Sequence, residues 1–278
     1  MTYSDHIYHV RELEPGLFRI DNSGVFMDLI VGSHHALLLD TGYGYGDLKA
    51  VVESITKLPL YVVNSHGHVD HACGNEQFGG AYIHPADIGL AIEHNGPGLR
   101  QLELETSEVP VDFDLEKHLR LGPGVLTPIG EGHTFDLGGI TLEVLHLPGH
   151  TAGSIGLYCP ERRLLYVGDA INGFLWLFLP EAQHLSAYIR TLHKAASLPF
   201  THMVLSHELT PVPKRKLWDY LDLAEHLDYD SGVIVPGPGC DYEVRICTRL
   251  GLHHDDRTRP GFAAIMISAA NARPGGVS

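Results

Sequence analysis

The chain has 278 residues, 44% of them hydrophobic and 19% charged, which is typical of a folded globular protein and excludes an intrinsically disordered one. The formal net charge of −15 opposes nonspecific binding to a phosphate backbone, which needs a basic stripe, so we expect no nucleic-acid partner. No run of eighteen apolar residues is present, so we expect no membrane-spanning helix and no membrane partner.

The first part of the chain is predicted to form strands. Short apolar or alternating runs, separated by Gly, Ser and Asn, predict strands at residues 16–21, 25–31 and 36–40. Apolar residues at helical spacing predict a helix over residues 47–56, and another strand follows at 60–64. A polar loop rich in histidine begins directly after this strand.

The middle of the chain, residues 93–124, contains acidic residues, two GPG sequences and little apolar periodicity. This composition predicts a loop-rich insertion or lid. A second series of elements follows, in which strands come first and helices later. The predicted strands are 134–137, 141–147, 154–159, 164–167 and 203–205, and the predicted helices are 180–196 and 214–227.

The same order, strands followed by helices, thus occurs twice. It predicts an α+β fold in which two mixed sheets pack together and helices cover their outer faces, a four-layer αββα sandwich. No linker rich in Pro or Ser separates the two halves. We expect one catalytic domain over residues 1–230 and a C-terminal extension over 231–278 that packs on this domain or trails from it.

The segment at residues 64–75, NSHGHVDHACGN, places His66, His68, Asp70 and His71 within six residues after a predicted strand. An extended backbone would direct the first three to one side and His71 to the other, so one loop can present ligands to two neighbouring ions. Imidazole and carboxylate suit zinc, iron or manganese. The alternative is a solvated polar turn, but the complete HxHxDH pattern is more specific than an isolated HxH.

Three further polar side chains follow predicted strands. His150 comes after Pro-Gly in LHLPGHT, Asp169 lies at the end of a predicted strand in LYVGDA, and His207 lies in VLSHE. Loops at strand ends are where functional sites collect. Each of the three alone would more often be a cap or turn residue, but together with the histidine-rich loop they predict a shared site.

Taken in order, these motifs resemble those of the metallo-β-lactamase superfamily, and in particular its hydroxyacylglutathione-hydrolase-like members. The matching positions are Asp40 in LLLDTG, the HGHVDH run, His150, Asp169 and His207. The resemblance covers roughly residues 16–210. It implies the αββα fold, with the metals in a groove between the two sheets.

The resemblance implies a centre of two divalent ions, with zinc expected and iron or manganese as alternatives. Two such ions about 3.5–4 Å apart can lower the pKa of a shared water towards about 7. Asp70 is also the predicted catalytic side chain, because a carboxylate there could orient that water and relay a proton. Asp40 would support the ligand loops by hydrogen bonding. The implied ligands are His66, His68 and His150 at the first metal, Asp70, His71 and His207 at the second, and Asp169 as the bridge.

The predicted function is hydrolysis of an ester, thioester or lactone bond in a small-molecule substrate. No Gly-x-Ser-x-Gly motif indicates a serine nucleophile, so water is the expected nucleophile. The alternatives are an iron-dependent enzyme similar to persulfide dioxygenases, and a phosphodiesterase or β-lactamase of the same superfamily. A noncatalytic scaffold is disfavoured because every ligand type is retained.

Phe174, Trp176 and Phe178 directly follow the expected bridging aspartate and are the candidate substrate-binding residues. They could form an apolar wall beside the metals, or a buried core segment. The basic residues 214–216 could bind an anionic substrate group, although a solvated helix start explains them equally well. His146 is expected to pack within its strand, and the stretch at 253–256 to be a solvated loop.

The four cysteines are scattered and form no CxxC pair, which argues against disulfides and against a thiolate zinc site. The first residues lack the basic and apolar regions of a secretory signal. These features predict a cytoplasmic protein. Association into a homo-oligomer stays open.

Overall fold

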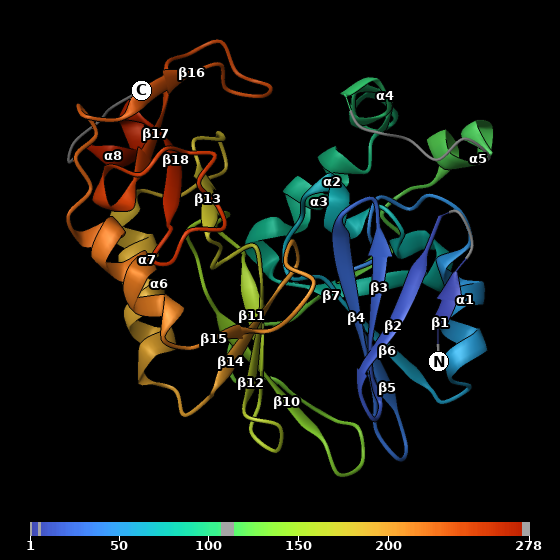
Figure 1. Cartoon of the computed structure of the whole chain (residues 1–278). Helices are drawn as coiled ribbons and strands as arrows, with labels where there is room; N and C mark the ends of the chain where they lie inside the picture. Colours follow the sequence, from blue (N-terminus) through green and yellow to red (C-terminus); the bar gives the residue numbers. More distant parts are fainter. Residues whose placement is uncertain (1, 5–6, 107–113, 274–278) are drawn as a thin grey trace.

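The computed structural model describes residues 2–4, 7–106 and 114–273. Two large sheets pack face to face, and helices lie against their outer faces (Figure 1). The predicted α+β fold, a four-layer αββα sandwich, is confirmed. Within the described residues, no helix is both long enough and apolar enough to cross a membrane.

The first large sheet contains eight strands in chain order, antiparallel from β1 to β5 and parallel from β5 to β8. The parallel pairs need crossovers, and the helix α1 (Leu48–Ile55) provides the first of them. Short helical turns follow β6 and β7: α2 (Val69–Ala72), η1 (Asn75–Phe78), η2 (Pro85–Asp87) and α3 (Ile88–His94). The strands are β1 (Thr2–Ser4), β2 (His9–Glu14), β3 (Leu17–Asn22), β4 (Val25–Val31), β5 (Ala36–Leu39), β6 (Leu60–Val63), β7 (Gly80–Ile83) and β8 (Val125–Pro128).

The second large sheet has the order β15-β14-β12-β11-β10-β9. Its one parallel pair, β12 with β14, is connected through α6 (Leu185–Ser197), and α7 (Lys216–Glu225) packs beside α6. The strands are β9 (Thr134–Asp136), β10 (Thr141–His146), β11 (Ile155–Cys159), β12 (Leu164–Gly168), β14 (His202–Leu205) and β15 (Val212–Pro213).

The layers are held together by separate apolar clusters. Between the sheets, Leu37 and Val63 of the first sheet pack with Val144, Leu157 and Val204 of the second, all of them buried. A second cluster joins α1 to the outer face of the first sheet, and a third joins α6 and α7 to the outer face of the second. Burial of both faces of each sheet explains why its central strands are apolar almost throughout.

A third sheet, which the sequence did not predict, has the order β13-β18-β17-β16. The strand β13 (Phe174–Leu177) lies in the chain between β12 and α6, but it pairs in parallel with β18 (Ala264–Ser268). The other two strands are β16 (Val233–Val235) and β17 (Val244–Thr248), with the turn η3 (Arg249–Gly251) before β18 and the helix α8 (Ala269–Ala272) after it. The C-terminal strands therefore build a sheet onto β13, the strand that follows Asp169 in the chain.

Part of the stretch expected to be loop-rich is helical, which differs from the prediction. The helices are α4 (Pro97–Thr106) and α5 (Leu115–Arg120), while residues 107–113 lie outside the described residues. Tertiary contacts stabilise α4 although its sequence has little apolar periodicity. Its buried Arg100 donates to the Cys73 carbonyl at 2.7 Å and to Asn95 Oδ1 at 2.8 Å. Asp114 caps α5 through the Lys117 amide at 3.0 Å.

Candidate metal centre

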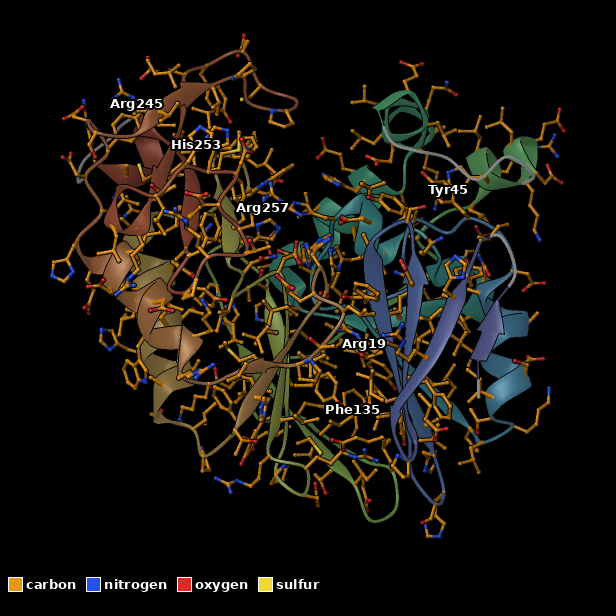
Figure 2. The ribbon with its side chains drawn as sticks, in the orientation of Figure 1. Arg19, Tyr45, Phe135, Arg245, His253 and Arg257 are labelled. Atoms are coloured by element: carbon orange, nitrogen blue, oxygen red, sulfur yellow. The ribbon has the colours of Figure 1, made fainter. Side chains whose placement is uncertain are left out.

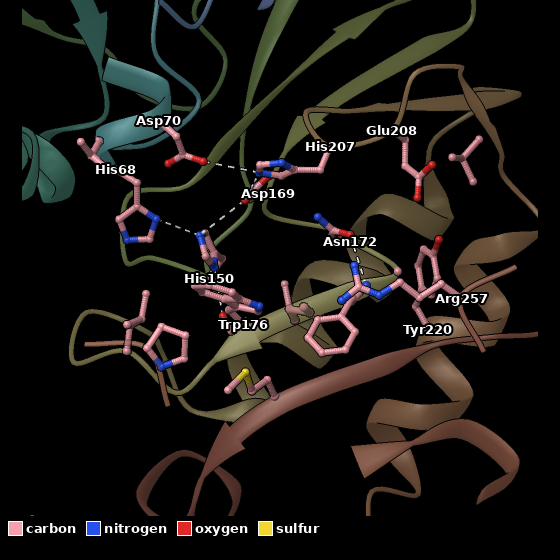
Figure 3. A pocket seen from close by; sticks show the side chains of 18 of the residues that line it. His68, Asp70, His150, Asp169, Asn172, Trp176, His207, Glu208, Tyr220 and Arg257 are labelled. Carbon is pink, nitrogen blue, oxygen red and sulfur yellow. Dashed lines mark hydrogen bonds and ion pairs between the residues drawn. The ribbon is translucent and has the colours of Figure 1, made fainter. Parts of the chain in front are cut away.

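The residues predicted to hold the metal ions lie together, and Figure 3 shows five of them: His68, Asp70, His150, Asp169 and His207. Each is on a loop that follows a strand, so the strands determine where the loops meet. The structure brings all of them into one cluster: Asp40 after β5, the segment from His66 to His71 after β6, His150 after β10, Asp169 after β12 and His207 after β14.

Three imidazole nitrogens face one another at the centre of the cluster. Nε2 of His66 and Nε2 of His150 each lie 3.0 Å from Nδ1 of His68. The second ring nitrogen of each histidine points outward to a fixed partner. Nδ1 of His66 lies 3.0 Å from Ser65 Oγ, and Nδ1 of His150 lies 2.9 Å from the Trp176 carbonyl oxygen. The outward bonds therefore orient the rings.

These outward bonds also determine the tautomers. Nδ1 of His150 must donate, because a carbonyl oxygen only accepts, and Nε2 of His68 donates to Glu181 Oε1 at 2.6 Å. Burial lowers the pKa of His66 well below its usual value and that of His150 to about 4, so both rings are neutral. Nε2 of His150 then presents a lone pair to the cluster, and the three converging nitrogens form a group that could hold a cation.

A second group lies beside the first. Nε2 of His71 is 3.2 Å from Asp70 Oδ2, and Nε2 of His207 is 3.5 Å from the same oxygen. Oδ2 of Asp169 lies 3.1 Å from His207 Nε2 and 3.9 Å from His150 Nε2, so this carboxylate reaches both groups. Nε2 of His71 and Oδ1 of Asp169 are buried without a hydrogen-bond partner among the described residues.

The electrostatics of the second group favour positive charge. Burial alone would lower the pKa of His71, but the carboxylates of Asp70, Asp40 and Asp169 outweigh it and raise that pKa well above its usual value. Burial is likewise outweighed at His207, whose pKa the neighbouring carboxylates raise to about 9. With its unpartnered buried atoms, its converging nitrogens and its lack of thiolates, the donor set fits divalent metal ions such as zinc.

Asp40 lies behind the ligands and connects its own loop, after β5, to the ligand loop after β6. Its carboxylate accepts from the Ser65 amide at 2.7 Å, from the Ser65 hydroxyl at 2.8 Å and from His71 Nδ1 at 2.9 Å. Its backbone has a φ of 64°, a conformation that aspartate adopts more readily than most residues. The carboxylate thereby directs Nε2 of His71 towards the cluster.

Asp87 is a functional position that sequence reasoning missed. This buried carboxylate accepts from the Gly67 amide at 3.0 Å, the Gly153 amide at 2.6 Å and the Thr151 hydroxyl at 2.7 Å. It therefore joins the loop that carries His66 and His68 to the loop that carries His150. A Cβ on Gly153 would lie 2.5 Å from the carboxylate, so a side chain there would displace the contact. Nothing in the local sequence distinguishes Asp87 from an ordinary turn residue.

Two further supports were also missed. Glu181, which fixes His68, follows β13. The only sequence feature near it is the aromatic run that precedes it, which does not indicate a role for a carboxylate. Arg19 is buried between the two large sheets (Figure 2) and donates to the Leu205 carbonyl at 2.7 Å and to the Glu208 carbonyl, on either side of His207. The charge of Arg19 is balanced by Asp28, 3.1 Å away.

A cavity of about 930 Å³ opens beside the cluster. Phe174 and Trp176, two of the three aromatic candidates, line it, and Trp176 is 37% exposed (Figure 3). Phe178 does not line it: the residue is 1% exposed and packs behind Trp176, with ring centroids 5.2 Å apart. The prediction for Phe178 is therefore wrong, because β13 ends at Leu177 and the alternation of faces ends with it.

Two histidine-containing segments set aside in the sequence remain outside the cluster. Nε2 of His146 lies 2.8 Å from the Ala152 carbonyl oxygen, and the ring stacks on His84. Because that carbonyl only accepts, His146 Nε2 is the donor. His253 and Asp255 form an ion pair at 3.3 Å, but their side chains are 64% and 77% exposed.

Comparison with known proteins gives concordant similarities. The family model described as the metallo-beta-lactamase superfamily matches residues 24–233. The human acyl-coenzyme A thioesterase MBLAC2 is 30% identical over 186 residues, which cover 61% of this chain and 66% of that protein. A hydroxyacylglutathione hydrolase from Brucella ovis is 27% identical over 202 residues, which cover 72% of this chain and 66% of that protein. The chain thus spans just under two thirds of the length of these relatives.

Among solved structures, a metallo-beta-lactamase from Pontibacter korlensis superposes with a TM-score of 0.55 and 19% identity. The match covers 79% of this chain and 99% of that one. At this identity the likeness concerns the fold alone.

Proposed function

The chain belongs to the metallo-β-lactamase superfamily, and we propose that it is a metal-dependent hydrolase that cleaves an ester, thioester or lactone bond in a small molecule. The observation that carries the proposal is the convergence of three histidine nitrogens, each with its other nitrogen fixed by a hydrogen bond, beside a carboxylate with an unpartnered oxygen. A relative named as a thioesterase and another named as a hydrolase support the reaction class.

The proposed centre holds two divalent ions. Zinc is the expected metal, and iron or manganese are the alternatives. The distances support a division of the ligands into two groups that Asp169 joins, because its carboxylate approaches a histidine of each. In this assignment, His66, His68 and His150 hold the first ion, and Asp70, His71 and His207 hold the second.

Such ions, when bound, supply Lewis acidity and lower the pKa of a bound water. The chain contributes the positions of the reacting groups. Asp70 lines the cavity, and its Oδ2 faces His71 and His207, which leaves Oδ1 to accept a proton from the attacking water and to pass it on to the leaving group. Phe174 and Trp176 would hold an apolar part of the substrate against β13 and keep bulk water away from the carbonyl.

A substrate panel tests the proposed function. Purified protein loaded with zinc would be offered a thioester, an ester, a lactone, a β-lactam, a phosphodiester and, with iron in place of zinc, a persulfide. We expect turnover of at least one of the first three, and loss of that turnover when a chelator removes the metal. Failure of all three, together with efficient phosphodiester cleavage or oxygen-dependent persulfide oxidation, would overturn the proposal.

A further inference from the structure

A positively charged side chain, Arg257, lies on the wall of the cavity, in the connection between β17 and β18. Its guanidinium carbon lies 4.7 Å over the centre of the Phe174 ring. Figure 3 shows Arg257 close to Asn172 and Tyr220, on the opposite side of the view from His68. Stacking on an aromatic ring restricts the guanidinium and leaves its N–H edges available for a ligand.

Arg257 has no ion-pair partner in the described part of the chain. The other cation in the cavity wall, Lys216, is paired with Asp219 at 3.3 Å, and the nearby Arg259 is paired with Asp256 at 3.6 Å. Glu208 also lines the cavity, but it lies beyond ion-pair distance from Arg257. An unpaired arginine facing a cavity in a chain of net charge −15 is therefore available to an anion from outside.

The wall between the two ends of the cavity is apolar. Trp176 lies next to His150, whose ring it holds through its carbonyl, and Phe262 and Met266 continue the wall. A ligand with its carbonyl at the metal end would thus cross apolar surface before it reached Arg257. Phe262 and Met266 come from the C-terminal residues, as Arg257 does, so these residues complete the cavity.

We propose that Arg257, supported by Phe174, is an anion-binding subsite that selects substrates with a carboxylate or phosphate group at the end remote from the bond that is cleaved. This proposal rests on the proposed function for the position of that bond. The planar guanidinium matches both oxyanions, because two parallel N–H groups can donate to two oxygens of either one. The C-terminal residues then determine specificity, while the loops of the two large sheets carry out the reaction.

The test uses three thioesters with the same acyl length and the same thiol, whose acyl chains end in a methyl, a carboxylate or a phosphate group. Kinetics would be measured for the full-length zinc-loaded protein, for Arg257→Gln and for the matched control Arg259→Gln. We expect Arg257→Gln to raise KM for one or both anionic substrates about tenfold or more and to leave the methyl substrate unchanged. Arg259→Gln should resemble the wild type, and Arg257→Lys should recover part of the loss.

The two anionic substrates also distinguish the source of the anion, because the one that loses more affinity in Arg257→Gln is the preferred class. An equal change for all three substrates, or no change, would overturn the proposal. Metal content, measured for each variant, separates a loss of the subsite from a loss of the metal site.

A binding measurement separates this proposal from the proposed function. If the wild type hydrolyses none of the three thioesters, the proposed carbonyl hydrolysis fails for this class of substrate, and the subsite is tested on metal-free protein. Calorimetry with octanesulfonate and with octanol should give at least tenfold tighter binding of the sulfonate, lost in Arg257→Gln and retained in Arg259→Gln. Equal binding of the two ligands, or binding of neither, would overturn the subsite.

Discussion

The side chains that face the cavity owe their orientation to groups behind them. His71 is held by Asp40, His68 by Glu181 and His150 by the Trp176 carbonyl. Each of these bonds occupies one ring nitrogen and directs the other inward. The hydrogen-bond partners of metal-binding histidines affect metal affinity although they do not touch the ion. Substituting these partners should therefore weaken metal binding.

Asp169→Ala should remove one metal ion and most of the activity, whereas His146→Ala should change neither. Asp169 approaches both histidine groups, with Oδ2 3.1 Å from His207 and 3.9 Å from His150. His146 ends the strand that precedes His150, but it bonds a backbone carbonyl outside the cluster. Elemental analysis of the two purified variants makes the comparison. Equal metal loss in both variants would show that the assignment of Asp169 as a ligand and of His146 as a non-ligand is wrong.

Glu181→Ala should weaken metal binding by about 10- to 100-fold, because His68 would lose the acceptor that fixes its tautomer. Glu225→Ala is a matched control, since Glu225 also bonds a histidine, His193 at 2.8 Å, but on the exposed surface. Competition against a chromophoric chelator measures the affinity of each variant. The same affinity in Glu181→Ala as in the control would contradict the role of Glu181.

At this scale the sequence predicted the residues that share a compact motif or a strand end, and it missed those that reach them from a distance. Glu181 lies 113 positions from His68, and Asp87 lies 66 positions from Gly153. Hydrogen bonds over such separations leave no periodicity or spacing in the chain. The Trp176 carbonyl is a backbone group, so no residue type could have indicated its contact with His150.

At the scale of elements, β13 connects the C-terminal sheet to the metal centre. Leu175 and Leu177 are buried, while Trp176 faces the cavity, so the strand has one face in the core and one on the cavity. The two sequence interpretations of the aromatic run, cavity wall and buried core, therefore each describe part of it. Pairing of β13 with β18 could not be predicted, because its partner lies about ninety residues away and β16 and β17 are short strands without a clear alternating pattern.

Trp176→Ala should impair substrate binding, whereas Phe178→Ala should impair stability. Removing the partly exposed Trp176 should raise KM about tenfold or more through lost apolar contact, with metal content unchanged. Removing the buried Phe178 should lower the free energy of unfolding by about 3–5 kcal/mol. Steady-state kinetics and denaturant unfolding of both variants test this. Normal kinetics in Trp176→Ala with a lowered melting temperature would assign Trp176 to the core.

At the scale of the whole molecule, the centre lies where the two large sheets meet, and its proposed ligands come from both. His66, His68 and His71 follow a strand of the first sheet, whereas His150, Asp169 and His207 follow strands of the second. The layered arrangement could be predicted because strand-then-helix order occurs twice in the sequence. The third sheet and the helices within residues 93–124 could not be predicted from the sequence, because they depend on tertiary contacts.

Metal should therefore stabilise the whole fold by joining the two sheets. Free metal at 100 times its dissociation constant would add about 2.7 kcal/mol to the free energy of unfolding. A chelator should lower the melting temperature of the wild type by several degrees, and the shift should be smaller in Asp169→Ala. The measurement is thermal unfolding with and without chelator. Identical melting temperatures would show that the ligand loops do not depend on metal.

The most direct test of the central claim is the rate of thioester hydrolysis while zinc is added to metal-free protein. If the cluster holds two catalytic ions, the rate should rise from near zero and level off at about two equivalents of zinc per chain. The same titration of Asp169→Ala should give little activity at any zinc concentration. A wild-type rate that is substantial without metal and unchanged by zinc would contradict metal-dependent hydrolysis at this site.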